Sequence, residues 1–406
     1  MAGGCRDAGA QALSVVRVLS LATLFPSAAR PHFGLFVARQ AEALAQRGDV
    51  DLVVVHPVAI APPPFHRVIN RPAELNLPAE ARNWGIAVHY PRYPYVPRFG
   101  ARWNPALIAR AVLPLARRLH AERPFDVVDA QFFYPDGPAA ARIAGALGLP
   151  LSIKARGSDI VMWSTRGAAL AQMRAAARQS GGMLAVSEAL KRDMTACGMA
   201  AEKIAVHYTG LDHALFRLRP RAQARRDVAL MVPGDGALLV SVGNLVRHKG
   251  QHLVIEALAK LPGARLVLAG TGPEHASLRA LAERLGVADR VHMPGSVEPA
   301  ELATLLGAAD VMALASEREG LANAWVEALA CGTPLVITDV GGAREVVREA
   351  SAGRVVAPTA EAIAGGVSEL LADPPAPAEV AANAARFSWD NNAAQISEFW
   401  HRLAGK

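Results

Sequence analysis

The chain has 406 residues, of which 52% are apolar, 19% are charged and 5% are aromatic. This composition excludes a disordered chain, and without an uncharged apolar run of about 18 residues the sequence predicts no membrane-spanning helix. The net charge of +7 rests on 43 cations, mostly arginine and not gathered in a stripe, which favours small anionic ligands or a membrane surface over nucleic acid.

Short β-branched runs alternate with longer amphipathic stretches along the whole chain. In the first half, the predicted strands are Val15–Leu19, Leu52–His56, Ile86–Tyr90, Val127–Ala130, Leu151–Lys154, Met183–Val186 and Ile204–His207. In the second half, they are Leu238–Val242, Arg265–Ala269, Val291–Met293, Val311–Leu314, Leu335–Thr338 and Arg354–Val356. The predicted helices include Phe36–Gln46, Asn104–His120, Gln251–Leu261, Ser277–Leu285 and Glu301–Leu306. Apolar strands separated by helices are typical of parallel sheets covered on both faces, so the predicted fold class is α/β.

These strands are too many for one sheet, because open sheets seldom exceed about ten strands. We therefore expect two doubly wound, Rossmann-like domains that face each other across a cleft. The polar, arginine-rich segment Phe216–Asp227 contains no predicted strand and marks the linker between residues 1–218 and residues 219–388. Residues 389–406 include the amphipathic run Asn391–Leu403, which has no following strand. We expect this run to form a helix that crosses back to the first domain.

The turn Gly243–Gly250 is the first candidate for ligand chemistry. Ligands of open parallel sheets bind beyond the carboxyl ends of the strands, and this turn follows a predicted strand. It combines two glycines with Arg247 and Lys249 and leads into a helix, which is typical of an anion site. It lacks the GxxxxGK[ST] pattern, and the alternative interpretation is a pair of solvated cations near a helix start.

Two glutamates follow the strand Val311–Leu314. Glu319 lies in the loop, and Glu327 falls within an otherwise apolar helix. An unpartnered buried carboxylate is costly, which favours function over a solvated helix face. Asn323 is expected to cap this helix, whose first N–H groups then remain available. Two carboxylates beside such a helix start suit a ligand that carries both hydroxyl groups and phosphates.

Loops of the first half supply further candidates. Gly34 immediately precedes a helix and would let the backbone approach a phosphate. Gln131 follows the strand Val127–Ala130, and Asp159 ends the turn Arg156-Gly157-Ser158-Asp159. Each turn alone is a weak signal, so their value depends on whether the fold brings them together.

Taken together, these loops resemble the family 4 retaining glycosyltransferases, which have the two-domain GT-B fold. The most specific segment is EGLANAWVEALACGTPLVITDVGGAREVV at residues 319–347, which is similar to the family's EGxxNxxxEAxAxGxPVVxTxxGGxxEVV. VGNLVRHKG resembles the family's VGRLxxxKG, and FGLFVARQAEAL resembles its N-terminal glycine loop. YPDG and GSD resemble its acceptor-domain loops, and TGLD resembles the NGxD that precedes its interdomain linker.

Two positions depart from the family pattern. Asn244 stands where many members carry a phosphate-binding arginine, so Arg247 is expected to substitute for it. Gln131 stands where many members carry a histidine near the acceptor. Glutamine can orient a hydroxyl group but cannot take a proton from it.

The resemblance implies transfer of a hexose from a nucleotide diphosphate-sugar to an acceptor hydroxyl, with retention of the anomeric configuration. It implies that the catalytic residues are Lys249 and Arg247, at the leaving diphosphate, and Glu319, at the donor sugar. The donor-binding residues that it implies are Gly34, Gly243, Gly320, Leu321, Asn323 and Glu327, with Glu327 at the ribose hydroxyls. It places Gln131 and Asp159 on the acceptor side. No metal or cofactor is expected, and the three scattered cysteines form no metal-binding pattern.

Three alternatives remain open at this stage. One is a sugar-nucleotide epimerase with the same two-domain fold, although such enzymes lack the paired glutamates. The second is an NAD-dependent oxidoreductase, whose GxGxxG pattern is approached by Gly270-Thr271-Gly272 but broken by His275. The third is a catalytically degenerate protein that binds a sugar nucleotide without turning it over.

The run Pro91–Pro105 interleaves arginines with aromatic residues and is predicted to be an irregular loop. Such a loop suits an anionic lipid headgroup zone, and the alternative is a loop that packs its rings on the first domain. Many relatives build envelope polysaccharides or glycolipids, so the expected acceptor is a saccharide or is lipid-linked. Without a secretory signal in the sequence, the expected location is the cytoplasm, with peripheral contact at the inner face of the membrane.

Overall fold

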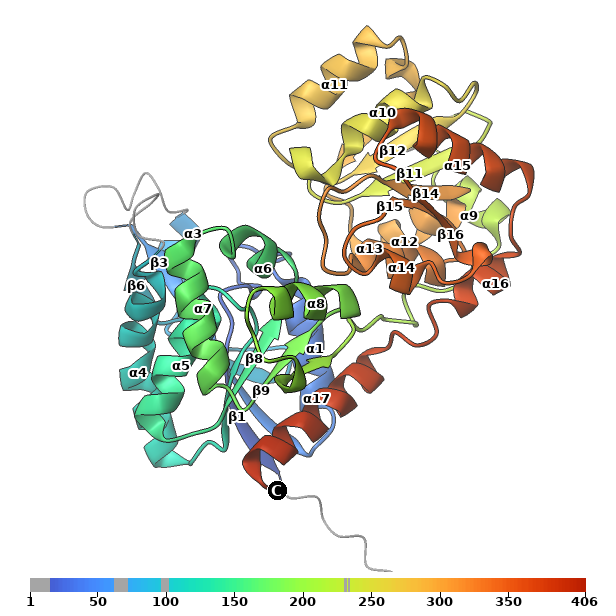
Figure 1. Cartoon of the computed structure of the whole chain (residues 1–406). Helices are drawn as coiled ribbons and strands as arrows, with labels where there is room; N and C mark the ends of the chain where they lie inside the picture. The colour runs from blue at the N-terminus through green and yellow to red at the C-terminus, as the bar shows by residue number, and fades with distance from the viewer. Residues whose placement is uncertain (1–14, 62–71, 96–101, 230–231, 233) are drawn as a thin grey trace, which may run out of the picture.

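The computed structural model describes residues 15–61, 72–95, 102–229, 232 and 234–406. The chain forms two α/β lobes, one blue to green and the other yellow to red in Figure 1. Each lobe contains its own sheet of mainly parallel strands with helices packed against it. This architecture confirms the predicted fold class of two Rossmann-like domains.

The first lobe is built on an eight-stranded sheet of order β10-β9-β8-β7-β1-β2-β5-β4. Its strands are β1 Val16–Leu21, β2 Val50–Val55, β4 Glu80–Asn83, β5 Ile86–His89, β7 Val127–Ala130, β8 Leu151–Ala155, β9 Gly182–Ala185 and β10 Ile204–Val206. All neighbours pair in parallel except β4, which pairs antiparallel with β5 at the edge. The first lobe's helices are α1 Leu35–Ala45, α3 Pro72–Leu75, α4 Asn104–Glu122, α5 Asp136–Leu147, α6 Ser158–Trp163, α7 Gly167–Gln179, α8 Glu188–Ala196 and the 3-10 turn η1 Ala201–Lys203.

The second lobe is built on a six-stranded parallel sheet of order β13-β12-β11-β14-β15-β16. Its strands are β11 Leu238–Val242, β12 Arg265–Ala269, β13 Val291–Gly295, β14 Val311–Leu314, β15 Leu335–Thr338 and β16 Gly353–Val356. Its helices are α9 Arg221–Asp227, α10 Gln251–Leu258, α11 His275–Arg284, α12 Pro299–Ala308, α13 Asn323–Ala330, α14 Ala343–Val346, α15 Ala360–Ala372 and α16 Pro377–Ala382. The 3-10 turns are η2 Arg247–Lys249, η3 Ala288–Arg290 and η4 Ala350–Ala352.

The sequence pattern missed three short strands, all in the first lobe. The prediction that residues 91–105 are irregular throughout was wrong, because β6 Arg92–Pro94 pairs in parallel with β3 Val58–Ile60. The edge strand β4 was missed because its sequence, EARN, is polar and lacks β-branched residues. The segment Phe216–Asp227 contains no strand, as predicted, but it includes α9, which packs on α12 of the second lobe.

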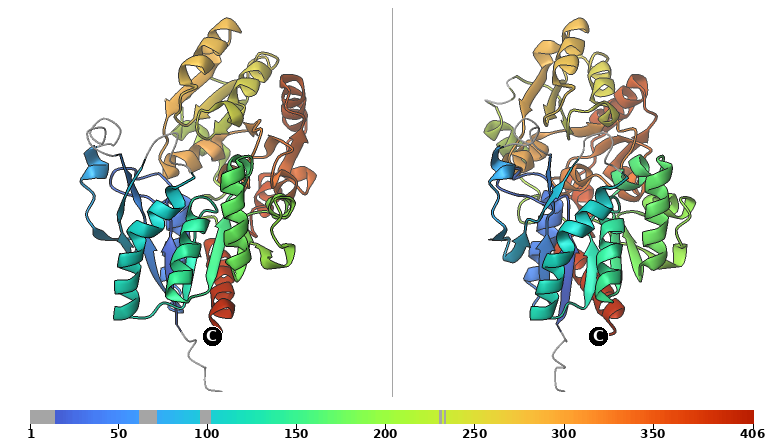
Figure 2. Two further views of the ribbon diagram at one scale, coloured as in Figure 1. Left: turned by 60° about the vertical axis from the view of Figure 1, so that its left-hand side comes forward. Right: turned by 90° about the vertical axis from the view of Figure 1, so that its left-hand side faces the viewer.

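The last helix, α17 Trp389–Ala404, crosses back to the first lobe, as predicted. It packs against α1, β1 and β7, and both views of Figure 2 keep it beside the first lobe. Ile396 and Trp400 are 0% exposed in this contact. Asn392 anchors the helix by accepting a hydrogen bond from Gln40 and donating one to the Tyr208 carbonyl, both at 2.6 Å.

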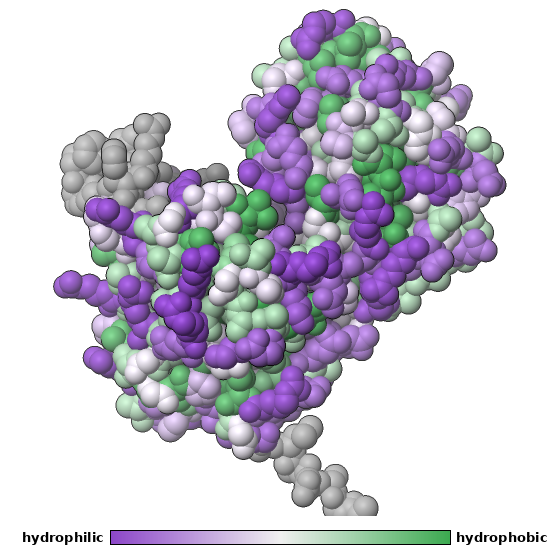
Figure 3. Space-filling model, in the orientation of Figure 1, coloured by the Kyte–Doolittle hydropathy of each residue, from purple (hydrophilic) through white to green (hydrophobic). Residues whose placement is uncertain are grey.

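The two lobes also touch across the cleft that separates them. A Cβ atom on Gly157 would lie 2.5 Å from the backbone nitrogen of Gly320, so the two glycine backbones are in direct contact. Beside them, the Glu345 carboxylate of the second lobe accepts hydrogen bonds from the N–H groups of Glu188 and Ala189, at 2.9 and 3.0 Å. It therefore caps the start of α8 in the first lobe. The space-filling view shows the notch between the lobes on a mostly hydrophilic face (Figure 3).

We expect the substitution Ile396→Ala to destabilise the protein by about 2–5 kcal/mol, because it removes a fully buried branched side chain from the contact between α17 and the first lobe. Urea denaturation measures the change. Leu285→Ala is the matched control, since Leu285 is 38% exposed and should change stability by less than about 1 kcal/mol. Equal losses in the two variants would contradict the packing described for α17.

Candidate functional site

A cavity of about 730 Å³ occupies the cleft between the lobes. The turns that follow β1 and β8 form its first-lobe wall, and the turns that follow β11 and β14 form its second-lobe wall. These are carboxyl ends of parallel strands, where ligands of open α/β sheets bind. Of the predicted site residues, the cavity is lined by Gly34, Lys249, Glu319, Gly320 and Leu321.

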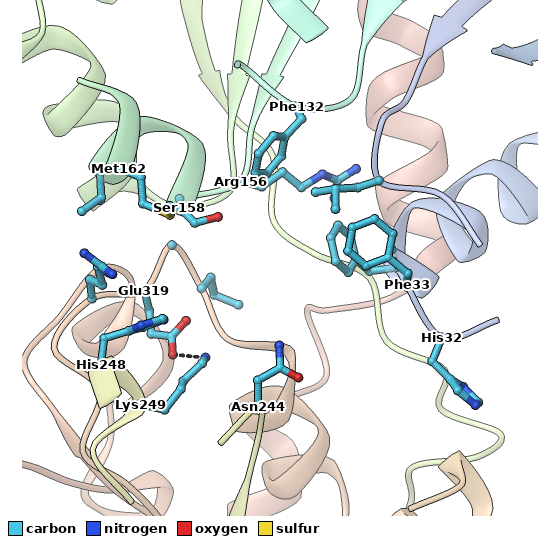
Figure 4. A pocket seen from close by; sticks show the side chains of 18 of the residues that line it. His32, Phe33, Phe132, Arg156, Ser158, Met162, Asn244, His248, Lys249 and Glu319 are labelled. Carbon is cyan, nitrogen blue, oxygen red and sulfur yellow. Dashed lines mark hydrogen bonds and ion pairs between the residues drawn. The ribbon is translucent and has the colours of Figure 1, made fainter. Parts of the chain in front are cut away.

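Lys249 and Glu319 form an ion pair on the second-lobe wall. The Lys249 ammonium group donates to Glu319 Oε1, and Ser316 Oγ donates to the same oxygen at 2.8 Å (Figure 4). Their side chains are 19% and 11% exposed, so both remain in contact with the cavity. The pair offers a cation for anionic oxygens and a carboxylate that can accept from hydroxyl groups.

Gly34 lies on the opposite, first-lobe wall of the cavity, at the start of α1. Its φ is +74°, and a Cβ atom there would lie 2.6 Å from the carbonyl carbon of Leu24, so only glycine fits. Gly34 is the N-cap residue of α1 and supplies no side-chain cap. Among the described residues, no side chain therefore accepts from the first N–H groups of this 11-residue helix, which lie at the edge of the cavity, where an anion would be stabilised.

Glu327 lies in a second cavity, of about 290 Å³, which also contacts Gly34. Its side chain is half-buried, and among the residues that the structure describes it has no hydrogen-bond or ion-pair partner. Burial raises the pKa of Glu327 to about 7. Asn323 lines the same cavity but does not cap α13 as predicted, because the N-cap residue is Ala322 and the Asn323 side chain accepts from Thr209 Oγ1 at 2.9 Å.

The remaining four predicted residues line neither the cleft cavity nor the smaller one. Arg247 lies in η2 with its side chain exposed. Gly243 lies behind Lys249, and a Cβ atom there would be 3.7 Å from Lys249 Cε. Asp159 is fully buried and accepts hydrogen bonds from four backbone N–H groups, while Gln131 is 4% exposed and donates to Asp129. The structure thus places both acceptor-side candidates beneath the wall rather than on it.

Arg156 is the main lining residue that the site prediction omitted. Its guanidinium donates to Gln40 Oε1 at 3.0 Å and to Gln131 Oε1 at 2.5 Å, and it stacks over the Phe36 ring at 4.8 Å. These partners are neutral, and within the described ranges no carboxylate forms an ion pair with it. Burial lowers the pKa of Arg156 to about 10, which keeps it charged at neutral pH. Arg156 directly follows the strand β8, and this position at the carboxyl end of a parallel strand could have marked it as a site residue.

Comparison with protein families gives the same division of the chain into two parts. Residues 34–215 match the family described as Glycosyltransferase Family 4, and residues 225–387 match Glycosyl transferases group 1. The chain therefore belongs to the glycosyltransferases that these two matched regions, family 4 and group 1, define. The first match includes Gly34, and the second includes Lys249 and the two glutamates Glu319 and Glu327.

Similar curated proteins are the D-inositol 3-phosphate glycosyltransferases of mycobacteria. The Mycobacterium leprae protein is 37% identical over 216 residues, which cover 50% of each chain, and the Mycobacterium avium protein is 38% identical over 207 residues, which cover 47% of each. The chain thus spans about half the length of the curated relatives that it matches.

Solved structures of the same fold cover nearly the whole chain. Sucrose-phosphate synthase from Thermosynechococcus elongatus has a TM-score of 0.77 at 20% identity and covers 96% of this chain and 99% of its own. Anabaena Alr3699/HepE in complex with UDP-glucose has a TM-score of 0.74 at 22% identity, with 95% and 99% covered. At this level of identity the likeness extends to the fold.

Two further features bear on cofactors and membranes. In the described part of the chain, no group of three or more His, Cys, Asp or Glu side chains could hold a metal ion. No helix within the same ranges is long and apolar enough to cross a bilayer.

The loop that was predicted to meet lipid is only partly described. Phe99 and Arg98 lie outside the described residues. Tyr93 is only 6% exposed, and Trp103 is 48% exposed beneath the guanidinium of Arg102.

We expect Glu327→Gln to stabilise the protein by about 1–2 kcal/mol at pH 8 and to have a smaller effect near pH 5. The pKa of Glu327 is about 7 in the folded chain, above its ordinary value, so the carboxylate costs stability as the pH rises from that ordinary value through 7. Thermal unfolding at the two pH values measures the difference. Glu301→Gln, at an exposed glutamate, is the control, and a gain that is equal at both pH values would contradict the assignment.

Proposed function

We propose that the protein transfers a hexose from a nucleotide diphosphate-sugar to an acceptor hydroxyl, with retention of the anomeric configuration and without a metal ion. The observation that carries this proposal is the Lys249–Glu319 pair, which faces the start of α1 across the cleft. One wall offers an ammonium group and a carboxylate, and the other offers backbone N–H groups. A diphosphate joined to a sugar has the charges and hydroxyl groups that such walls recognise.

The leaving diphosphate gains negative charge as the anomeric bond loosens, so cations and N–H groups aimed at it accelerate the reaction. Lys249 and the N-terminus of α1 fill this role in our proposal, and Arg156 adds a permanent charge from the first lobe. Arg247 is the weaker candidate, because its side chain is exposed outside the cavity. Glu319 then accepts from hydroxyl groups of the donor sugar.

The nucleoside half of the donor occupies the smaller cavity in this proposal. Glu327 lies there without a partner in the described structure, and a carboxylate suits the two neighbouring hydroxyls of a ribose. The Anabaena protein of the same fold was solved with UDP-glucose, which makes UDP-glucose the first donor to test. The glycines of the turn Gly270–Gly272 pack against the backbone of residues 243–245, which disfavours a dinucleotide loop there.

We also propose that the protein acts in the cytoplasm, in the synthesis of an envelope polysaccharide or glycolipid. Any contact with an anionic membrane surface would fall on Arg92, Arg102 and Trp103, the exposed charged and aromatic side chains of the described loop. Tyr93 and Tyr95 turn inward instead and line a cavity of the first lobe. Contact with lipid is proposed only for the exposed residues of this loop.

We expect Lys249→Ala to reduce turnover of UDP-glucose by about 10–100-fold or more, because a charge-assisted contact of about 1.5–3 kcal/mol to the leaving group is lost. The fold should survive, since Lys249 contributes little to the core. Release of UDP, with and without an acceptor, measures the effect. Lys260→Ala is the matched control, because Lys260 pairs with Glu361 on the surface of the second lobe.

Full activity of the Lys249→Ala variant at a low donor concentration would contradict the assignment. A thermal-shift series with UDP, GDP and ADP gives an independent check. A nucleotide present at 100 times its dissociation constant stabilises the folded state by about 2.7 kcal/mol, so the preferred base would show the largest shift. No shift with any of the three would contradict a donor built on UDP, GDP or ADP.

A further inference from the structure

A third cavity, of about 400 Å³, opens beside the cleft entirely within the first lobe. The turn after β1, the ends of β2 and β7, the helices α3 and α6 and the small β3–β6 sheet form its walls. It shares Leu24, Arg30, Phe33 and Phe132 with the cleft cavity. Figure 4 shows Phe33 and Phe132 on the wall that faces Lys249 and Glu319. A ligand in this cavity would therefore reach the place where we propose that the donor sugar lies.

Aromatic rings dominate the lining of this cavity. Tyr134 is buried and packs on Trp163, with ring centroids 4.6 Å apart. Tyr93 is 6% exposed, whereas Tyr95 and Trp163 are half-buried, and all three line the cavity. The Arg166 guanidinium lies over the Trp163 ring, 4.5 Å from its centroid, so Trp163 offers the cavity only the part of its ring that Tyr134 and Arg166 leave uncovered. Flat aromatic faces bind the apolar C–H faces of other rings without demanding a charge.

The charges of the described lining residues cancel. Arg30 and Glu74 are the only two full charges among them, and they form an ion pair with Arg30 Nε 2.7 Å from Glu74 Oε1. His56 stays neutral because burial lowers its pKa, and its Nδ1 lies 2.8 Å from the Ala22 carbonyl oxygen. A phosphate group in this cavity would lose its hydration without gaining an uncommitted cation from these residues. Hydroxyl groups, in contrast, can both donate to Glu74 and accept from Arg30.

We propose that this aromatic cavity binds the acceptor and that the acceptor presents an uncharged sugar ring to it. The inference rests on the proposed function, because it assumes that a glycosyl group is transferred in the adjoining cleft. It separates this chain from the mycobacterial relatives, which are named for D-inositol 3-phosphate, a compound that carries a phosphate.

The experiment compares methyl hexosides with the same compounds phosphorylated at O6, using UDP-glucose as the donor and the full-length protein. We expect the uncharged hexoside to be preferred by at least about tenfold in kcat/KM. Trp163→Ala should raise the KM for the hexoside by about tenfold while leaving the hydrolysis of UDP-glucose by water unchanged. Trp163→Phe should restore most of the loss, because it keeps an aromatic face. Trp103→Ala is the matched control, since Trp103 lies outside all the described cavity linings.

Several results would overturn the inference. One is a preference for the phosphorylated partner of the pair, and another is the failure of every uncharged hexoside to accept sugar while UDP-glucose is still hydrolysed. Equal acceptor KM values in Trp163→Ala and Trp103→Ala would also overturn it. If the wild-type protein neither binds nor hydrolyses any nucleotide-sugar, the proposed function itself fails, and the inference fails with it.

Discussion

The cleft depends on a contact in which two backbones meet without side chains between them. Gly157 and Gly320 come from different lobes. A Cβ atom on either glycine would collide with the backbone of the opposite loop. Glu345 lies beside this contact and joins the lobes by accepting from N–H groups at the start of α8 and from the Tyr208 hydroxyl at 2.9 Å. Hydrogen bonds to a charged group contribute about 1.5–3 kcal/mol each. Because the cavity takes one wall from each lobe, this contact sets its width.

Two cations of the cleft, Lys249 and Arg156, are held in different ways. Lys249 is balanced by Glu319 within the same lobe, so its charge is available to a ligand only in competition with a carboxylate. Arg156 is held by the amide oxygens of Gln40 and Gln131, which orient the guanidinium but do not neutralise it. A ligand therefore meets a positive charge from the first lobe and an exchangeable ion pair from the second.

The sequence predicts the sheets better than it predicts the site. The buried parallel strands are continuous apolar runs, and β11, β12, β14 and β15 have the predicted bounds. Periodicity says nothing of which way a loop side chain points. Arg247 and Lys249 are two residues apart in one turn, yet of the two only Lys249 faces the cavity. The Asp159 carboxylate accepts hydrogen bonds from backbone N–H groups of its own turn and so does not face the cavity. The site prediction omitted Arg156 because the position of its guanidinium depends on Gln131 and Gln40, which are 25 and 116 residues away in the sequence.

The return of α17 to the first lobe means that the order of synthesis is not the order of folding. Domains usually fold as they leave the ribosome, the N-terminal one first. Here the groove between α1 and the first sheet stays unfilled until Ile396 and Trp400 have been made, after the whole second lobe. The second lobe is thus an insertion in a first lobe that is completed last. During translation the apolar face of that first lobe needs protection from other chains, and residues 1–218 alone do not form a complete folding unit.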